Sequence, residues 1–321
     1  MTVALIDRYR DRLPVSDSTP IVSLGEGSTP LLHAPRLGRE LGVDLWLKWE
    51  ASNPTGSYKD RGMTVAISKA LEGRARAVVC ASTGNTSASA AAYAARAGLP
   101  AIVLVAEGAA GGKLVQARAL GARVLAVRGS FDQALAAARQ LGEREGYVLV
   151  NSLNPNRVEG QKTAVFEIVE GLGGTPDAFV LPYGGGGNTT AYRKALDELS
   201  LSAPVYSVEA ADRPRTLASA IRIEHPAHGE RVAASGARVH AVSDKEIVTA
   251  WRELAREEGM FCEPASATGL AFLRGSDELR GARVVVTVTG HGLKDPAAAD
   301  THAPAPVVVD ADPAAIAEAA G

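Results

Sequence analysis

The sequence has few of the features that mark several specialised classes of protein. Only two cysteines occur in 321 residues, Cys80 and Cys262, and both stand beside apolar residues without the spacing of a metal site. We expect two buried, reduced thiols, as in a cytoplasmic protein. The formal net charge of −2 gives no overall basic field, so nucleic acid is not an expected partner.

Long apolar runs are also missing. No stretch is long enough to cross a membrane, and the N-terminus lacks the basic and apolar regions of a signal peptide, so we expect neither feature. Hydrophobic residues make up 46% of the chain and charged residues 22%, which is ordinary for a globular protein. The length suffices for one large domain or two ordinary ones.

Glycine, in contrast, is abundant, and it often ends a segment with helical periodicity. Short apolar runs alternate with these segments, which predicts parallel strands covered by helices, an α/β fold. The expected strands are 45–50, 77–82, 101–105, 123–127, 147–150, 178–181, 205–208 and 284–288, and the expected helices are 84–97, 113–120, 131–145, 161–171, 188–199 and one that follows a capping box at 243–246.

The strand–helix rhythm restarts after residue 151, which predicts two open parallel-sheet α/β domains. The expected larger domain comprises residues 1–52 and 152–321, and the smaller one residues 53–151. Residues 223–240 are polar and are expected to form a loop, whose three histidines lack metal-ligand spacing. Three consecutive valines at 307–309 are expected to add an edge strand.

Four polar or glycine-rich segments come at strand ends, where parallel sheets bind ligands. In Ser57-Tyr58-Lys59-Asp60, the serine is expected to cap a helix that begins near the lysine. Ser82-Thr83-Gly84-Asn85-Thr86 offers hydroxyls and backbone N–H groups to an anion. The backbone of Gly184-Gly185-Gly186-Gly187-Asn188 is free to wrap a phosphate. Thr287-Val288-Thr289-Gly290-His291 runs from a strand into a glycine-rich turn.

Each segment alone has an ordinary explanation. A lysine at a helix start is most often solvated, and serine, threonine and asparagine are common helix caps. The glycine run fits neither the dinucleotide fingerprint nor the P-loop, and such runs are often simple turns. What favours a ligand site is that all four occur in one chain, each at a strand end.

Together the four segments resemble the pyridoxal-phosphate enzymes of fold type II, the tryptophan-synthase-β-like family, over roughly residues 20–296. The resemblance implies pyridoxal 5′-phosphate in a cleft between a larger cofactor-binding domain and a smaller substrate-side domain. It implies that Lys59 forms the Schiff base and that Asn85 contacts the pyridine 3′-oxygen. It also implies that the loop from Gly184 to Asn188 holds the cofactor phosphate, and that Thr289, in preference to Thr287, faces the ring nitrogen.

Within this family the chain is most similar to the threonine synthases. Their closing motif resembles residues 289–296, and their substrate-phosphate segment resembles Asn151-Ser152-Leu153-Asn154-Pro155-Asn156-Arg157. Residues 220–223 and 263–266 are also similar, whereas Glu224-His225-Pro226 replaces a Gly-Asn-Pro-like turn. The resemblance implies γ-elimination of phosphate and β-addition of water, which convert O-phospho-L-homoserine to L-threonine.

Such a substrate carries a carboxylate at one end and a phosphate at the other. An arginine suits the phosphate because its guanidinium makes two parallel hydrogen bonds, although arginines also form ordinary surface salt bridges. The expected carboxylate site is the backbone of Ser82, Thr83, Gly84 and Asn85. The expected phosphate site is Ser152, Arg157, Asn188 and Thr86, with Lys59, and Asn151 belongs to the segment that lines it.

Two other functions remain open from the sequence. One is a threonine or serine dehydratase, or another β-eliminating or β-replacing enzyme of the same fold, which has no second phosphate to hold. The other is a non-catalytic binding protein that kept the fold, against which the intact motif around Lys59 argues. The family resemblance also implies a homodimer, with a small phosphorylated amino acid as the substrate.

Overall fold

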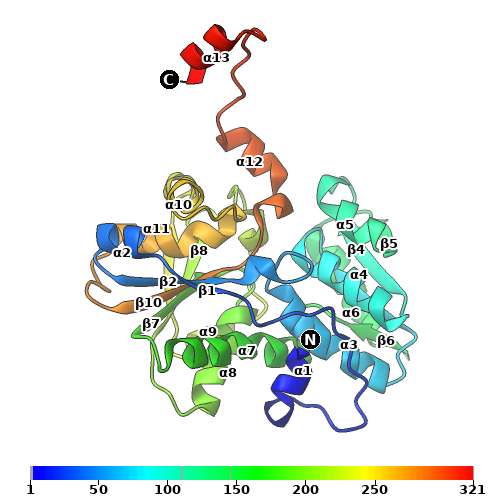
Figure 1. The fold of residues 1–321 in the computed structure, drawn as a ribbon. Helices are drawn as coiled ribbons and strands as arrows, with labels where there is room; N and C mark the ends of the chain where they lie inside the picture. The colour runs from blue at the N-terminus through cyan, green and yellow to red at the C-terminus, as the bar shows by residue number, and fades with distance from the viewer. Residues whose placement is uncertain (1–2, 110, 145, 321) are drawn as a thin grey trace.

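The computed structural model describes residues 3–109, 111–144 and 146–320, and these form two sheets flanked by helices (Figure 1). The larger sheet has the strand order β1-β2-β10-β7-β8-β9 and the smaller one β5-β4-β3-β6. The predicted α/β class with two parallel-sheet units is confirmed. The strands are β1 (Leu31–His33), β2 (Asp44–Trp49), β3 (Ala77–Ala81), β4 (Ala101–Ala106), β5 (Arg123–Val127), β6 (Tyr147–Leu149), β7 (Ala178–Pro182), β8 (Val205–Ala210), β9 (Arg238–Val242) and β10 (Arg283–Val288).

The central strands are apolar along their length because helices cover both of their faces. β10 pairs in parallel with β2 and β7, so that Val286 has Leu47 on one side and Val180 on the other. β1 runs antiparallel to β2 at one edge of the larger sheet. The helices are α1 (Leu5–Arg8), α2 (Pro35–Leu41), α3 (Lys59–Glu72), α4 (Asn85–Ala97), α5 (Val115–Ala119), α6 (Phe131–Gly142), α7 (Pro155–Leu172), α8 (Gly187–Glu198), α9 (Gly229–Ala234), α10 (Asp244–Glu257), α11 (Thr268–Gly275), α12 (Pro296–His302) and α13 (Pro313–Ala320), with 3-10 turns η1 (Arg10–Arg12), η2 (Glu50–Ser52), η3 (Gly111–Leu114), η4 (Ser219–Ile221), η5 (Pro264–Ala267) and η6 (Gly292–Lys294).

Most predicted elements lie within a few residues of their observed bounds, but four details were wrong. α7 begins at Pro155 rather than 161, because Asn154 caps it by accepting a hydrogen bond from the Asn156 N–H at 3.0 Å. Residues 223–240 contain α9 and most of β9 rather than a loop alone. Residues 307–309 form no strand. Ser57 does not cap α3, since its buried hydroxyl has no hydrogen-bond partner among the residues that the structure describes.

Two further expectations from composition can be compared with the structure. Cys80 and Cys262 are free thiols and are buried, as predicted. Burial raises the pKa of Cys80 to about 12, so this thiol is uncharged at neutral pH. Within the described ranges, no helix combines the length and the apolar character needed to cross a membrane.

A buried cluster of charges joins α3 to the larger sheet. The Arg61 guanidinium on α3 donates to Glu50 at the end of β2 at 2.7 and 2.8 Å, and to Glu167 on α7 at 2.7 and 2.6 Å. Lys48 on β2 donates to the same Glu167 carboxylate at 2.7 Å. Two cations thus face two anions, and all four side chains are buried. This pairing offsets the desolvation of the charges and fixes where α3 begins.

α3 and α7 also approach each other closely through glycine. A Cβ atom at Gly160 on α7 would lie 1.9 Å from the carbonyl oxygen of Arg61, and one at Gly62 on α3 would lie 2.5 Å from the carbonyl oxygen of Arg157. Only a residue without a side chain fits at either position. The contact places the first turn of α3, which carries Lys59, against the first turn of α7, which carries Arg157.

Replacement of Gly160 by alanine is expected to lower the free energy of unfolding by about 1–3 kcal/mol, because the added methyl group must push the two helices apart. Gly171→Ala, on the same helix, is the matched control, since its Cβ meets only the mobile end of Leu31. Urea unfolding of both variants measures the difference. Equal stability of the two variants would contradict the close helix contact.

Candidate active site

The loop that carries Lys59 is held against the closing motif of the chain. The Tyr58 N–H donates to the Thr289 carbonyl oxygen at 3.0 Å, and Ser57 forms a β-bridge with Gly290. Asp60, the residue after Lys59, accepts hydrogen bonds from the Thr55 N–H at 2.7 Å and the Thr55 hydroxyl at 2.6 Å. The first and fourth sequence segments are therefore side by side.

Lys59 lies between two groups of polar residues. Its ammonium donates to the Tyr58 hydroxyl at 2.6 Å. Burial raises the pKa of the Glu263 carboxyl, and the charge of Lys59 acts in the opposite direction. Burial lowers the pKa of His228, and the charge of Lys59 lowers it further. The charge of the lysine therefore acts on side chains from two different segments of the chain.

The first group contains Asn85, Glu263 and Thr289. The Asn85 amide on α4 donates to the Glu263 carboxylate at 2.9 and 3.1 Å, and the Thr289 hydroxyl donates to it at 3.2 Å. Ser266 lies 2.9 Å from the Thr289 hydroxyl. Thr287, in contrast, pairs with Tyr192 in the core. Of the two threonines, Thr289 therefore lies beside Asn85.

The second group is the glycine loop between β7 and α8. Among the described residues, none of the backbone N–H groups from Gly184 to Thr189 donates to a protein acceptor. Gly186 has a φ of +81°, which turns the loop into the start of the helix. The Asn188 amide nitrogen is buried and has no partner within the described ranges. Free N–H groups at a helix N-terminus suit a phosphate.

His228 completes this second group, although the sequence reasoning placed it in an uninvolved loop. The turn after Glu224-His225-Pro226 brings His228 to the glycine loop, where its backbone N–H donates to the Gly185 carbonyl oxygen at 3.0 Å. Its Nε2 donates to the Ser152 carbonyl at 2.9 Å, so Nδ1 is the unprotonated nitrogen and is left without a partner. Glu263 was similarly noted only as part of residues 263–266, which resemble a segment of the threonine synthases. No spacing in the sequence identified either side chain.

The start of α4 offers a separate set of donors. Apart from the Gly84 N–H, which reaches the Ser82 hydroxyl at 3.2 Å, the N–H groups of Thr83, Asn85 and Thr86 have no acceptor among the described residues. The Asn151 side chain exchanges two hydrogen bonds with the Ala81 backbone, each 2.9 Å long. Asn151 thereby ties the end of β3 to the segment before α7.

Arg157 is fully buried but has no carboxylate partner among the described residues. Its guanidinium donates to the carbonyl oxygens of Val150 at 2.8 Å and Lys59 at 3.4 Å, and its Nε has no partner there. Burial lowers its pKa to about 10, so it remains a cation at neutral pH. Ser152, in the segment before α7, lies by the glycine loop. Its Cβ is 3.5 Å from the point where a Gly187 Cβ would stand.

Polar contacts also span from the small-sheet segment to the closing motif. Lys113 forms an ion pair with Asp295 at 3.0 Å and donates to Ser219 at 2.6 Å. Lys294 donates to the Gln116 side chain at 2.5 Å and to the Thr55 carbonyl at 3.1 Å. These contacts link α5 and η3 to the segments around Lys59 and Thr289, and they were not predicted.

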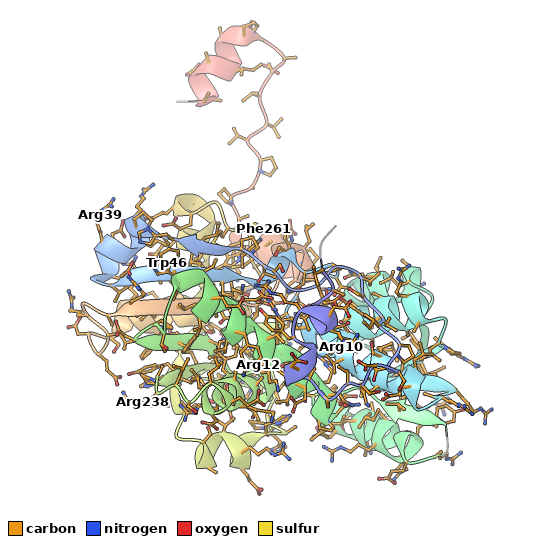
Figure 2. The ribbon with its side chains drawn as sticks, turned by 60° about the horizontal axis from the view of Figure 1, so that its bottom comes forward. Arg10, Arg12, Arg39, Trp46, Arg238 and Phe261 are labelled. Carbon is orange, nitrogen blue, oxygen red and sulfur yellow. The ribbon has the colours of Figure 1, made fainter. Side chains whose placement is uncertain are left out.

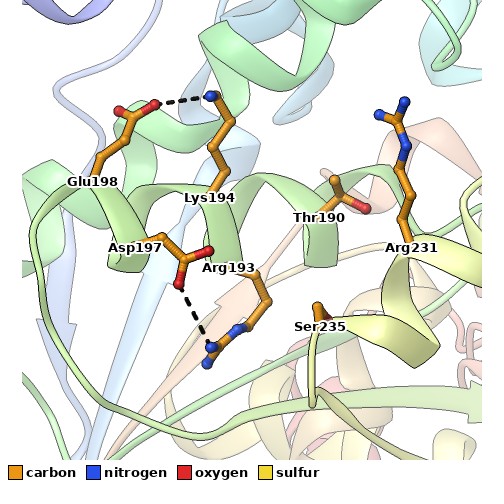
Figure 3. Close-up of a pocket in the computed structure, with 7 residues that line it drawn as sticks. All are labelled: Thr190, Arg193, Lys194, Asp197, Glu198, Arg231 and Ser235. Carbon is orange, nitrogen blue, oxygen red and sulfur yellow. Dashed lines mark ion pairs between the residues drawn. The ribbon is translucent and has the colours of Figure 1, made fainter.

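A surface hollow of about 470 Å³ lies elsewhere, along α8 and α9 (Figure 3). Its charges are largely paired, Lys194 with Glu198 at 3.0 Å and Arg193 with Asp197 at 3.7 Å. It includes no residue of the four segments. The candidate site is therefore the place where the segments meet, not this hollow.

The residues at that place fit pyridoxal phosphate. The glycine loop supplies unpaired N–H groups for a phosphate, and Asn188 adds a buried, unpaired amide. Lys59 is a half-buried amine whose charge acts on His228, which bonds the glycine loop, and on Glu263, which accepts from Asn85 and Thr289. The sequence of residues 22–290 matches the family described as pyridoxal-phosphate dependent enzymes. The chain belongs to this family.

Curated relatives in this family narrow the comparison. A threonine synthase of Synechocystis is 50% identical, over 91% of this chain and 83% of the relative. A threonine synthase of Mycobacterium leprae is 48% identical over 96% and 93%. One from Methanocaldococcus jannaschii is 43% identical over 95% and 84%. The resemblance to threonine synthases is confirmed.

Solved structures agree on the fold of this pyridoxal-phosphate enzyme. A fungal L-serine ammonia-lyase from Rhizomucor miehei superposes with a TM-score of 0.76 at 25% identity, over 86% of this chain and 97% of that one. Maize serine racemase gives 0.74 at 22% identity, over 82% and 88%. The second likeness shows the fold alone.

The pH dependence of stability should report the burial of Asp60, the residue after Lys59. Burial raises the pKa of Asp60 from 3.8 to about 6, although Ser89 and Thr55 donate to the carboxylate. The folded state then binds a proton more tightly than the unfolded state, so this residue lowers stability as pH rises from about 4 to about 6. Asp60→Asn removes that loss. Urea unfolding of the holoenzyme across this range measures it, with the exposed Asp17→Asn as control. Parallel curves for wild type and Asp60→Asn would contradict the prediction.

Proposed function

We propose that this protein is a threonine synthase that converts O-phospho-L-homoserine and water to L-threonine and phosphate. The observation that carries the proposal is Arg157, a buried cation without a carboxylate partner in the described chain, on the helix that follows Ser152, whose side chain lies against the glycine loop. A second anion held there, in addition to the cofactor phosphate, distinguishes this substrate from free threonine or serine. The curated relatives named threonine synthase support the same reaction.

Pyridoxal phosphate would be held by residues from both sheets. Lys59 would bind it covalently, Gly184 to Asn188 would donate to its phosphate, Asn85 would contact its 3′-oxygen, and Thr289 would face its ring nitrogen. When bound, the cofactor supplies an electron sink for carbanions formed next to the substrate amine. A hydroxyl such as Thr289, in place of a carboxylate, leaves the ring nitrogen less protonated.

Proton transfer would fall to Lys59. With the cofactor bound, the Lys59 amine would take the α-proton of the substrate and then move a proton at the β-carbon. The Tyr58 hydroxyl, 2.6 Å from Nζ, holds the amine in place. The Arg157 guanidinium donates a hydrogen bond to the Lys59 carbonyl oxygen and so holds the lysine backbone. The lysine backbone therefore stays in position when its side chain moves.

The two ends of the substrate would occupy different helix starts. The unpaired N–H groups of Thr83, Asn85 and Thr86, with the hydroxyl of Ser82, suit the carboxylate. Ser152 and Arg157 suit the leaving phosphate, because donors to a dianion form strong, charge-assisted hydrogen bonds. The further residues proposed to line this site are Gly84, Asn151, Asn188 and Lys59.

We also propose the organisation in which the site works. The larger, cofactor-binding domain is residues 1–52 and 152–321, and the smaller, substrate-side domain is residues 53–151. The contacts of Lys113 and Lys294 across the two sheets support a cleft that closes over the substrate. The protein is proposed to be a homodimer, and its two free, buried cysteines are compatible with the cytoplasm.

A product assay tests the reaction. The holoenzyme given O-phosphohomoserine should release threonine and phosphate in equal amounts, because elimination and hydration are coupled. Lys59→Ala should release neither, whereas Lys69→Ala, a lysine in the last turn of the same helix, should retain activity. Mass spectrometry and phosphate colorimetry measure both products. Release of an oxo acid and ammonia from free threonine or serine alone would identify a dehydratase instead.

Variants of the phosphate site test the substrate class separately. Ser152→Ala should raise the KM for O-phosphohomoserine about tenfold or more, through the loss of one hydrogen bond to a charged group. Inhibition by homoserine, which has no phosphate, should change little. Arg157→Ala should raise the KM further while cofactor absorbance is retained, and Ser152→Ala leaves the carbonyl contacts of Arg157 intact. Unchanged kinetics in both variants would exclude a phosphate clamp.

A further inference from the structure

The last part of the chain stands away from the body of the protein. After α12, residues 303–309 run extended and lead to α13, well clear of both sheets (Figure 1). We call residues 303–320 the C-terminal arm. Val307 is 76% exposed and Val308 is 95% exposed. Among the described residues, the backbone groups of 304–309 make no hydrogen bonds. Three exposed valines with an unpaired backbone have the character of a strand that lacks a neighbour.

The small sheet offers an edge that lacks a neighbour in the same way. β5 is the outermost strand, and its far side carries no other strand among the described residues. Leu125 on β5 is 39% exposed. Val115, which begins α5 before the strand, is 57% exposed, and Phe131, which begins α6 after it, is 43% exposed. The other edge strands offer less to a new strand. β1 and β6 have only three residues each, and on β9 Arg238 is already paired with Glu278.

The charges of the two segments are complementary. Residues 111–131 contain Lys113, Arg118, Arg123 and Arg128 but no aspartate or glutamate. Lys113 pairs with Asp295, whereas the three arginines are exposed and form no ion pair within the described ranges. The arm has the opposite composition, with three carboxylates at Asp310, Asp312 and Glu318 and no lysine or arginine after residue 302. Opposite charges of this kind favour one partner and one register.

We propose that the C-terminal arm of one copy of this chain adds to β5 of a second copy, with residues 307–309 as a fifth strand of the small sheet and Asp310 near an arginine at one end of β5. The inference rests on the proposed homodimer. Strand addition satisfies the unpaired backbone of both segments, and reciprocal exchange gives a two-fold interface. It also covers an exposed sheet edge.

The root of the arm favours a second copy over the same chain. Arg252 on α10 donates to the His302 carbonyl at 2.9 Å, and Ala299 on α12 packs on the core of the larger sheet. The arm therefore leaves from a fixed point on the larger sheet. From there it rises away from its own small sheet (Figure 1).

Disulfide trapping between differently marked holoenzyme chains tests the pairing. One chain carries Asp310→Cys, and the other carries Arg123→Cys or Arg128→Cys, which bracket β5 for either strand direction. Mixing should give a disulfide between the two chains with one of the brackets. Arg39→Cys, an exposed arginine on α2 at the opposite end of the molecule from the small sheet, is the control and should give none (Figure 2). The native cysteines are buried and do not compete.

Sedimentation of the holoenzyme provides the second measurement. Val308→Asp and a chain ending at His302 should each raise the dimer dissociation constant at least tenfold. Asp310→Lys with Asp312→Lys should weaken it as well, and Arg123→Glu with Arg128→Glu in the same chain should restore it. Absence of a disulfide with both brackets overturns the proposal while leaving the homodimer intact. A monomeric wild-type protein overturns both. Neither result depends on the reaction that the enzyme catalyses.

Discussion

The buried charge cluster around Arg61 is the constraint on which the position of Lys59 depends. Arg61 lies two residues after Lys59, so the carboxylates that hold Arg61 also hold the first turn of α3. Glu50 comes from η2, directly after β2, and Glu167 from α7, and Lys48 completes a neutral set of two cations and two anions. Removal of any one member leaves a buried charge without its partner, which is far costlier than loss of a surface ion pair.

The rest of the site follows from this anchor and from the helix contact beside it. Once α3 is fixed, the glycines at 62 and 160 let α7 approach until Arg157 reaches the Lys59 carbonyl. The segment before α7 then carries Ser152 to the glycine loop, and the segment before α3 carries Tyr58 to Thr289. Helix starts from both sheets thus meet around one lysine, each with N–H groups that lack acceptors in the described chain. Such a place attracts anions, which is why a doubly anionic cofactor and substrate suit it.

How much of this could be predicted from the sequence depended on whether a feature was local. Strand and helix periods, the capping box at Ser243 and the glycine loop are encoded in adjacent residues, and the structure confirms these elements. Glu263 and His228 were not found, because their importance comes from contacts across 178 residues to Asn85 and 76 residues to Ser152. The start of α7 was missed for a different reason. Its first turn, Pro155-Asn156-Arg157, has no apolar stripe even though Arg157 is buried, so hydrophobic periodicity gave no signal there, and only Asn154-Pro155 marked it.

Arg61 and Arg157 show how burial alone does not determine the state of a charge. Both are fully buried, yet the carboxylates around Arg61 raise its pKa, whereas Arg157 meets carbonyl oxygens and its pKa falls. The charge of Arg61 is neutralised within the chain, and that of Arg157 is not. A phosphate bound beside Arg157 would supply the missing countercharge. In the proposed function, binding energy from that contact would stabilise the state in which both sheets close on the lysine, and the same cation would serve both substrate choice and the geometry of the site.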